Sequence, residues 1–430
     1  MFKAFLENPR VTLKKTLSNN AVSGTLVVTL GSFIGSIFSY LLQIILGRQL
    51  SIEDFGTFNT LLSFSMILGV FSGALSTSVI KKVSSLCAKS KFDVMTKLFL
   101  HLNVFSLSLG ALLFAVLFFA RENIANFLNI SDINAIISFA AFISLTLFSM
   151  LPASYLQGLL RFKAFAFYNV LSLFLRLLIP SALVFMGYSV SAVFLGMVSS
   201  SLISVILALL LLKKNFDNFH EVCLSGHFKS VLFFLGPLIF MRVGLTFLNN
   251  ADIILVKHLF SGVDAGLYSG LVTIGKVLLF GAGSVATVMF PQISAAVASG
   301  KDLRKELKGF LMVQVFLVFT GVLVFSLFPR LLTLIMFGEK YLSAVSYVPR
   351  FALFVGFYVL INFFVMFFMA AEKYVATVFL LLGVFLQAVL IWFFHDSILQ
   401  VVNINVLVTG LVLLGLILYY KLMNFKKDLF

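Results

Sequence analysis

AVSGTLVVTLGSFIGSIFSYLLQIILG, residues 21–47, contains no charged side chain. A helix needs roughly 20 apolar residues to cross a bilayer, so this stretch is long enough to form one membrane span. Similar stretches recur along the 430 residues, of which 61% are hydrophobic and only 11% charged. A soluble domain needs far more polar surface than this composition provides. The sequence therefore predicts an all-α polytopic membrane protein.

Windows of this length, separated by polar breaks, predict 12 transmembrane helices. They are residues 21–47, 57–80, 97–120, 133–156, 167–187, 192–212, 231–258, 267–290, 309–335, 349–371, 378–395 and 401–420.

Lysine and arginine gather in every second gap between these spans. With the N-terminus inside, the cytoplasmic segments carry 22 Lys and Arg and the outer segments carry 6. Cytoplasmic loops of membrane proteins are enriched in these residues, so both termini are predicted to be cytoplasmic. The formal charge of +15 is then a topology signal. It does not indicate a nucleic-acid partner, and it suits a face lying against anionic lipid headgroups.

A weak internal repeat divides the chain into two halves. ILGRQLSIEDFGTF (residues 45–58) recurs as ILVKHLFSGVDAGLY (residues 254–268) with one inserted residue. Six spans separate the copies, so both halves have the same orientation and should be related by a pseudo-two-fold axis along the membrane normal. We expect two six-helix bundles, residues 1–220 and 221–430.

Motifs of catalysis and of cofactor binding do not occur. The sequence has no GxxxxGK[ST] loop, HExxH, GxSxG or Cys/His cluster, and its five histidines are scattered singly. We therefore expect no enzymatic activity, no metal and no cofactor.

Charged residues inside predicted spans are the candidate functional residues, because such residues are costly in lipid and usually face water or a partner. Three cations lie deep in their spans: Arg176, Arg242 and Lys276. Polar neighbours on the same helix faces add Thr246, Asn249 and Thr273 as candidate cavity residues. A polar stripe on the first span, from Thr25 to Gln43, fits helix packing and cavity lining equally well.

Three cations and one acid, Asp252, make the predicted cavity net positive by two. A cationic cavity attracts an anionic substrate, and arginine suits phosphate and carboxylate groups. Asp252 lies nearer the outer end of its span. It is a candidate for ion coupling, for a contact at the outer gate or for a structural ion pair.

Several short motifs in a fixed order resemble the polysaccharide-biosynthesis flippases of the multidrug/oligosaccharidyl-lipid/polysaccharide exporter superfamily. They are GRQLSIEDFGTF (residues 47–58), QGLLRF (157–162), GLY (266–268) and FGEKY (337–341), together with Asp252. The resemblance covers about residues 18–420.

This resemblance implies a flippase in a bacterial inner membrane that moves an undecaprenyl-pyrophosphate-linked oligosaccharide to the outer leaflet. A polysaccharide polymerase and a ligase are the implied protein partners. Flippases of the peptidoglycan precursor generally have 14 spans and arginines in their first two. This chain departs from both features, so that substrate ranks lower. A drug/cation antiporter and a non-transporting scaffold are the alternatives.

Overall fold

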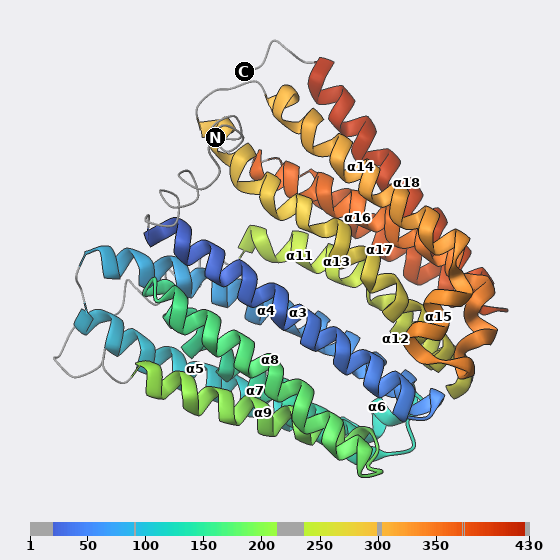
Figure 1. The fold of residues 1–430 in the computed structure, drawn as a ribbon, viewed down its shortest axis with the longest axis horizontal. Coiled ribbons are helices and arrows are strands. Elements are labelled where there is room, and N and C mark those ends of the chain that lie inside the picture. The colour runs from blue at the N-terminus through green and yellow to red at the C-terminus, as the bar shows by residue number, and fades with distance from the viewer. Residues whose placement is uncertain are drawn as a thin grey trace. The chain divides into compact units, whose positions relative to one another are not determined.

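The computed structural model describes residues 20–89, 92–212, 236–298, 303–371, 373 and 375–425. Regular structure in these residues is entirely helical (Figure 1). The helices are α3 (Asn20–Gln49), α4 (Ile52–Ala88), α5 (Phe92–Phe119), α6 (Arg121–Phe127), α7 (Ile133–Gly158), α8 (Phe162–Phe185), α9 (Val190–Leu212), α11 (Gly236–Leu248), α12 (Ala251–Leu259), α13 (Gly262–Ala298), α14 (Leu303–Leu327), α15 (Pro329–Phe337), η2 (Glu339–Tyr347, a 3₁₀ helix), α16 (Val348–Ala370), α17 (Ala376–Phe393) and α18 (Ile398–Phe425).

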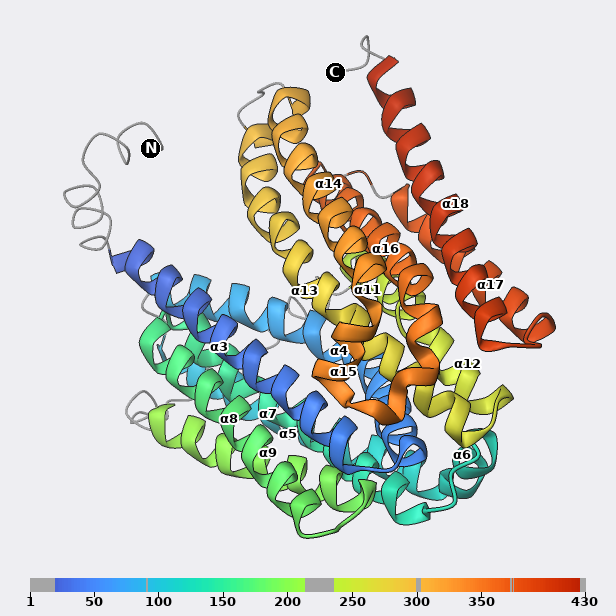
Figure 2. The ribbon, with the colours of Figure 1, turned by 45° about the vertical axis from the view of Figure 1, so that its right-hand side comes forward.

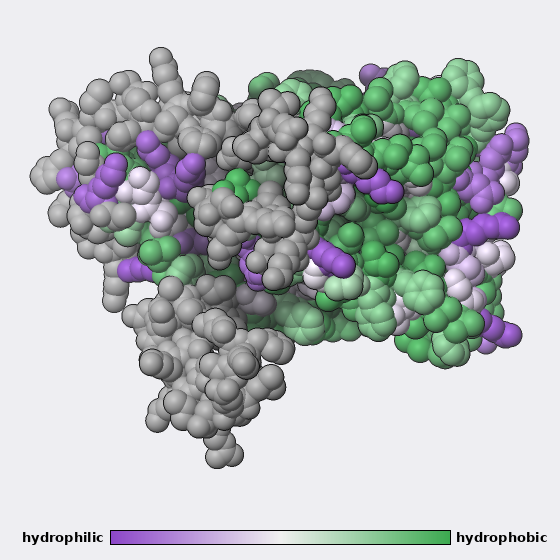
Figure 3. Space-filling model, turned by 90° about the horizontal axis from the view of Figure 1, so that it is seen from above, coloured by the Kyte–Doolittle hydropathy of each residue, from purple (hydrophilic) through white to green (hydrophobic). Residues whose placement is uncertain are grey.

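Eleven candidate membrane spans occur among the described residues, by length and apolar composition. Large apolar side chains such as Phe33, Phe119 and Phe385 are exposed, as expected for a surface that faces lipid. Figure 3 shows hydrophobic side chains over much of the described surface on the visible face. The predicted class, an all-α polytopic membrane protein, is confirmed.

Two predicted spans differ from the structure. The span predicted at 231–258 is broken into α11 and α12 at Asn249 and Asn250, and its residues 231–235 lie outside the described residues. The span predicted at 309–335 ends earlier, because α14 stops at Leu327 and Pro329 begins α15. Proline lacks the backbone N–H that would continue a helix.

The first of two compact units contains residues 1–45, 71–122 and 132–235, of which the described residues form most of α3, about half of α4, and α5, α7, α8 and α9. Helix α7 packs against α5, α8 and α9. The Tyr155 hydroxyl on α7 donates to the Met95 carbonyl on α5 at 3.2 Å. The predicted boundary between bundles, at residues 220 and 221, lies outside the described residues.

The second unit contains residues 46–70, 123–131 and 236–430. Helix α16 packs against α13, α14 and α18, while α11 and α12 pack against α17 (Figure 2). The connection between α3 and α4 thus belongs to the second unit together with the first half of α4, although most of α3 belongs to the first unit.

Equivalent glycines of the internal repeat meet in the second unit. A Cβ on Gly56 would lie 2.9 Å from the Cα of Gly266, and a Cβ on Gly266 would overlap the backbone oxygen of Ile52. Helices α4 and α13 can therefore approach this closely only because both positions lack a side chain.

Gly266→Ala should destabilise the protein by about 2 kcal/mol or more, because the added methyl group meets a backbone atom that cannot move aside easily. Thermal unfolding of the purified protein in detergent measures the effect. Gly281→Ala on the same helix is the control, since nothing lies within 4 Å of its Cβ position. Equal melting temperatures for the two variants would contradict this account.

Candidate functional site

The break between α11 and α12 exposes backbone groups that a continuous helix would satisfy internally. The last four carbonyls of a helix have no partner within that helix, and unsatisfied carbonyls are costly in lipid. Here all four accept a hydrogen bond from elsewhere. Tyr358 Oη donates to the Leu245 carbonyl at 3.1 Å, and Gln387 Nε2 donates to the Leu248 carbonyl at 3.3 Å. Asn250 supplies the other two bonds: its side-chain Nδ2 donates to the Thr246 carbonyl at 2.8 Å, and its backbone N–H donates to the Phe247 carbonyl at 3.1 Å.

Asp252 stands in the first turn of α12, immediately after the break, and is 1% exposed. Its Oδ2 accepts hydrogen bonds from the Tyr268 hydroxyl and from Asn405 Nδ2, the latter at 3.1 Å. Carboxylates near a helix N-terminus are stabilised by the positive end of the helix dipole. The carboxylate is therefore held by two side chains and by the start of its own helix.

Asn405 connects this carboxylate to the helix break. Its Nδ2 also lies 2.7 Å from Tyr268 Oη, and its Oδ1 accepts from Gln387 Nε2 at 2.8 Å. Tyr268, Gln387 and Asn405 are each fully buried. One polar network from α12, α13, α17 and α18 thus supports both Asp252 and the carbonyl of Leu248.

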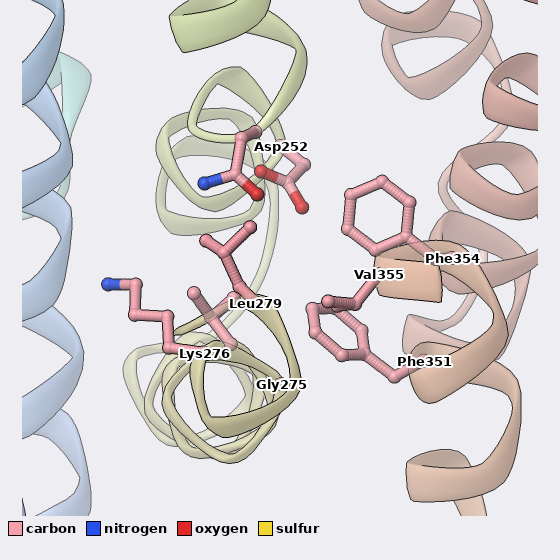
Figure 4. Close-up of a pocket in the computed structure, with 9 residues that line it drawn as sticks. Asp252, Gly275, Lys276, Leu279, Phe351, Phe354 and Val355 are labelled. Atoms are coloured by element: carbon pink, nitrogen blue, oxygen red, sulfur yellow. The ribbon is translucent and has the colours of Figure 1, made fainter. Parts of the chain in front are cut away.

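A cavity opens beside this network. Three candidate residues, Asn249, Asp252 and Lys276, supply its polar lining. Asp252 and Lys276 lie across from Phe351 and Phe354 of α16 (Figure 4). Val272, Gly275, Leu279 and Val355 complete the lining. It has about 240 Å³ of space not occupied by atoms, counting its open mouth. The break therefore faces a small space with polar groups on one wall and aromatic rings on the other.

Lys276 and Asp252 carry the charges of this wall. They lie near enough for their charges to interact, but the described residues show no ion pair between them within 4 Å. The Lys276 amine extends away from Phe351 and Phe354 (Figure 4). The Lys276 ammonium is thus not held in an ion pair with Asp252 in this arrangement.

The other candidates lie outside the cavity lining. Thr273 is fully buried and its hydroxyl donates to the Ser269 carbonyl at 2.9 Å. Thr246 is half-buried, and Arg242 is exposed on α11, seven residues before Asn249. Because seven residues are close to two helical turns, Arg242 extends the polar face that ends at the break.

Arg176 lies in the first unit, on α8. Its guanidinium carbon is 4.9 Å from the centroid of the Phe142 ring, and one of its nitrogens donates to the Met197 sulfur at 3.7 Å. Both contacts are typical of a cation packed among aromatic and polarisable groups. Its proposed role in the cavity stays a prediction.

Tyr268, Tyr358, Gln387 and Asn405 were not predicted as site residues. Their side chains donate hydrogen bonds to carbonyl or carboxylate oxygens of other helices. These four residues are uncharged in character, so the presence of charged side chains in apolar spans does not indicate them. One signal was available: Gln387 is the only amide side chain within the predicted span 378–395. A lone amide in lipid usually has a partner on another helix.

Among the described residues no group of three or more His, Cys, Asp or Glu side chains could hold a metal ion.

Several solved structures share this fold. An inward-facing multidrug resistance MATE family transporter of the MOP superfamily matches with a TM-score of 0.73 and 12% identity, over 92% of this chain and 96% of that one. The lipid II flippase MurJ, in an inward closed conformation, matches with a TM-score of 0.72 and 15% identity, over 92% of this chain and 87% of that one. A MOP superfamily transporter from Pyrococcus furiosus matches with a TM-score of 0.57 and 15% identity, over 92% of this chain and 95% of that one.

The chain therefore shares its fold with a MATE family transporter of the MOP superfamily and with the lipid II flippase MurJ. Residues 21–297 match the model of the polysaccharide biosynthesis protein family, and the chain belongs to that family. No curated protein is significantly similar to it in sequence.

Asn405→Leu should lower the stability of the protein by on the order of 3 kcal/mol, because it removes the Nδ2 donor of the Asp252 carboxylate and the Oδ1 acceptor of the Gln387 amide. Thermal unfolding in detergent measures the loss. Asn403→Leu on the same helix is the matched control, since Asn403 is exposed. Equal unfolding of the two variants would show that the network contributes no stability.

Proposed function

We propose that this protein is a flippase that moves an undecaprenyl-pyrophosphate-linked oligosaccharide from the cytoplasmic to the outer leaflet of a bacterial inner membrane. The observation that carries the proposal is the broken helix α11–α12, whose break places Asp252 and Asn249 at a cavity beside Lys276. Discontinuous helices of this kind form the substrate and ion sites of many transporters. Membership of a polysaccharide biosynthesis family supports a saccharide cargo.

The anionic part of this cargo is the pyrophosphate. Lys276, which lines the cavity, and Arg242, two helical turns before Asn249 on α11, are our candidates for binding that anion. Because the cavity lining itself contains one cation and one acid, the excess of positive charge depends on Arg242. The prenyl tail stays in lipid, and a polymerase and a ligase then act on the exported unit.

Asp252 is our candidate for coupling transport to an ion gradient. A buried carboxylate in a membrane is a common site for a proton or a cation, and the same feature would serve a drug/cation antiporter, the second candidate function. If Asp252→Asn kept the same dependence of transport on a proton or sodium gradient, this residue would be excluded as the coupling site.

Mass spectrometry of lipid extracts from a strain that lacks the gene tests the proposed cargo, together with a gel of its surface polysaccharide. We expect undecaprenyl-pyrophosphate repeat units to accumulate and polymer to disappear. Unchanged lipids and polymer with altered sensitivity to cationic compounds would favour the antiporter. A scaffold would move no substrate in liposomes.

In the same strain, Lys276→Ala and Arg242→Ala should each fail to restore polymer while reaching the membrane in normal amounts, because each removes a cation from the path of the pyrophosphate. Arg242→Lys should restore it partly, since it keeps the charge and loses the bidentate geometry. Lys308→Ala, an exposed lysine of α14, is the control and should restore polymer fully. Normal polymer with both alanine variants would refute the cationic path.

A further inference from the structure

Tyr268 of α13 has contacts at both ends of its side chain. Its hydroxyl donates to Oδ2 of Asp252 and accepts from Asn405 Nδ2 at 2.7 Å. Its ring meets the ring of Phe351 on α16 edge to face, with 5.8 Å between the centroids and 88° between the planes. Tyr268 is 0% exposed, so water shares neither contact. The side chain therefore joins the acid of the polar network to the lining of the cavity.

Phe351 is enclosed by neighbours from two helices. It is 3% exposed, and its ring centroid is 5.2 Å from that of Phe354, the second aromatic residue of the cavity lining. Gly275 of α13 lies against it, since a Cβ on this glycine would be 2.7 Å from Phe351 Cε1. Protein interiors are close-packed, so a shift of one buried ring is passed to the rings that it touches. The position of Tyr268 therefore affects Phe351 and Phe354, which we call the aromatic wall.

The internal repeat places the acid and the tyrosine hydroxyl together in the second half of the chain. Alignment of the two copies sets Phe58 against Tyr268, and two residues before each copy stand Gln43 and Asp252. The first half thus keeps the aromatic ring but has neither the charge nor the hydroxyl. Because the hydroxyl accompanies the acid, we infer that it serves the acid and is not required for the packing of the ring.

The strength of the bond between Tyr268 and Asp252 depends on the charge of the carboxyl group. Hydrogen bonds to an ionised acceptor are shorter and roughly twice as strong as those between neutral groups. A proton or a cation that neutralises Asp252 therefore weakens the hold on the Tyr268 hydroxyl. Asn405 is then the stronger partner of that hydroxyl. The ring of Tyr268, and with it Phe351, is fixed less tightly.

We propose that Tyr268 is a positioning residue that couples the charge of Asp252 to the shape of the aromatic wall: its hydroxyl binds the acid, and its ring holds Phe351. This inference rests on the proposed function, in which Asp252 takes up the coupling ion and the cavity takes up the cargo. Tyr268 is the side chain through which ion and cargo act on each other. The contrasting arrangement is an acid that acts on the cavity only through its electric field.

Thiol chemistry on the purified protein in detergent tests the coupling. Val355→Cys is the probe, in a chain with Cys87→Ser and Cys223→Ser. Val355 lines the cavity one helical turn after Phe351, so the space beside the new thiol depends on that ring. Methyl and benzyl methanethiosulfonate react with the same thiolate but differ in size. The ratio of their rates cancels the thiolate fraction, which a change of charge also alters, and reports the space.

Asp252→Asn should raise the benzyl-to-methyl ratio about fivefold, as expected when a charge-assisted hydrogen bond becomes a neutral one. Tyr268→Phe should raise the ratio by a similar factor, since the ring stays and the hydroxyl bond is lost. The double variant should show no further increase, because the two substitutions remove the same link.

Tyr155→Phe is the matched control. Tyr155 is a 0% exposed tyrosine of α7 whose hydroxyl donates to a backbone carbonyl, so this variant also loses one buried hydroxyl. Its ratio should equal that of the parent, and Asp252→Asn should keep its full effect in this background. Leu279→Cys, at another residue of the cavity lining, is a second probe for the case in which Val355→Cys does not fold.

The coupling through Tyr268 would be overturned by an unchanged ratio in Asp252→Asn, or by an effect of Asp252→Asn that is equally large in Tyr268→Phe and in the parent. Loss of the effect in Tyr155→Phe would overturn it too. The assay contains neither substrate nor ion gradient. Non-additive ratios with unchanged lipids in the strain that lacks the gene would leave the coupling standing and refute the flippase. Additive ratios with accumulated undecaprenyl-pyrophosphate units would do the opposite.

Discussion

A helix that breaks inside a membrane must find partners for the carbonyl groups it frees, and this requirement organises the second unit. Tyr358, Asn250 and Gln387 satisfy the four carbonyls at the end of α11. Because two of these side chains come from α16 and α17, the break can exist only where both helices pack against it. Asp252, Asn405 and the cavity are all positioned by this one arrangement.

The sequence was sufficient for the class of fold because lipid imposes a simple rule. Stretches of about 20 apolar residues become helices, and 11 such spans are present. The sequence did not predict where an apolar span divides into two helices. Hydropathy averages over a window, so two consecutive amides, Asn249 and Asn250, hardly lower the score of the span 231–258, although the chain breaks there.

The site was predictable only in part, for a related reason. Lys276, Asp252 and Asn249 were found because charge and amide groups are conspicuous in apolar spans, and the structure brings these three to one cavity. Arg176 was equally conspicuous; it lies in the first unit against Phe142, and its role stays a prediction. Periodicity gives the face of one helix but not the neighbour which that face meets, so residues on separate helices cannot be grouped from sequence alone.

Helix α12 connects the two places where charge is concentrated. It has nine residues, a length of ~13 Å, with Asp252 in its first turn and Lys257 in its last. Asp252 is bound into the network of Tyr268 and Asn405, while Lys257 lies in the field of Glu53 and Asp54, the acids of the α3–α4 corner. The Asp252 network and the contact with the acids of the α3–α4 corner therefore both depend on the position of a single short element.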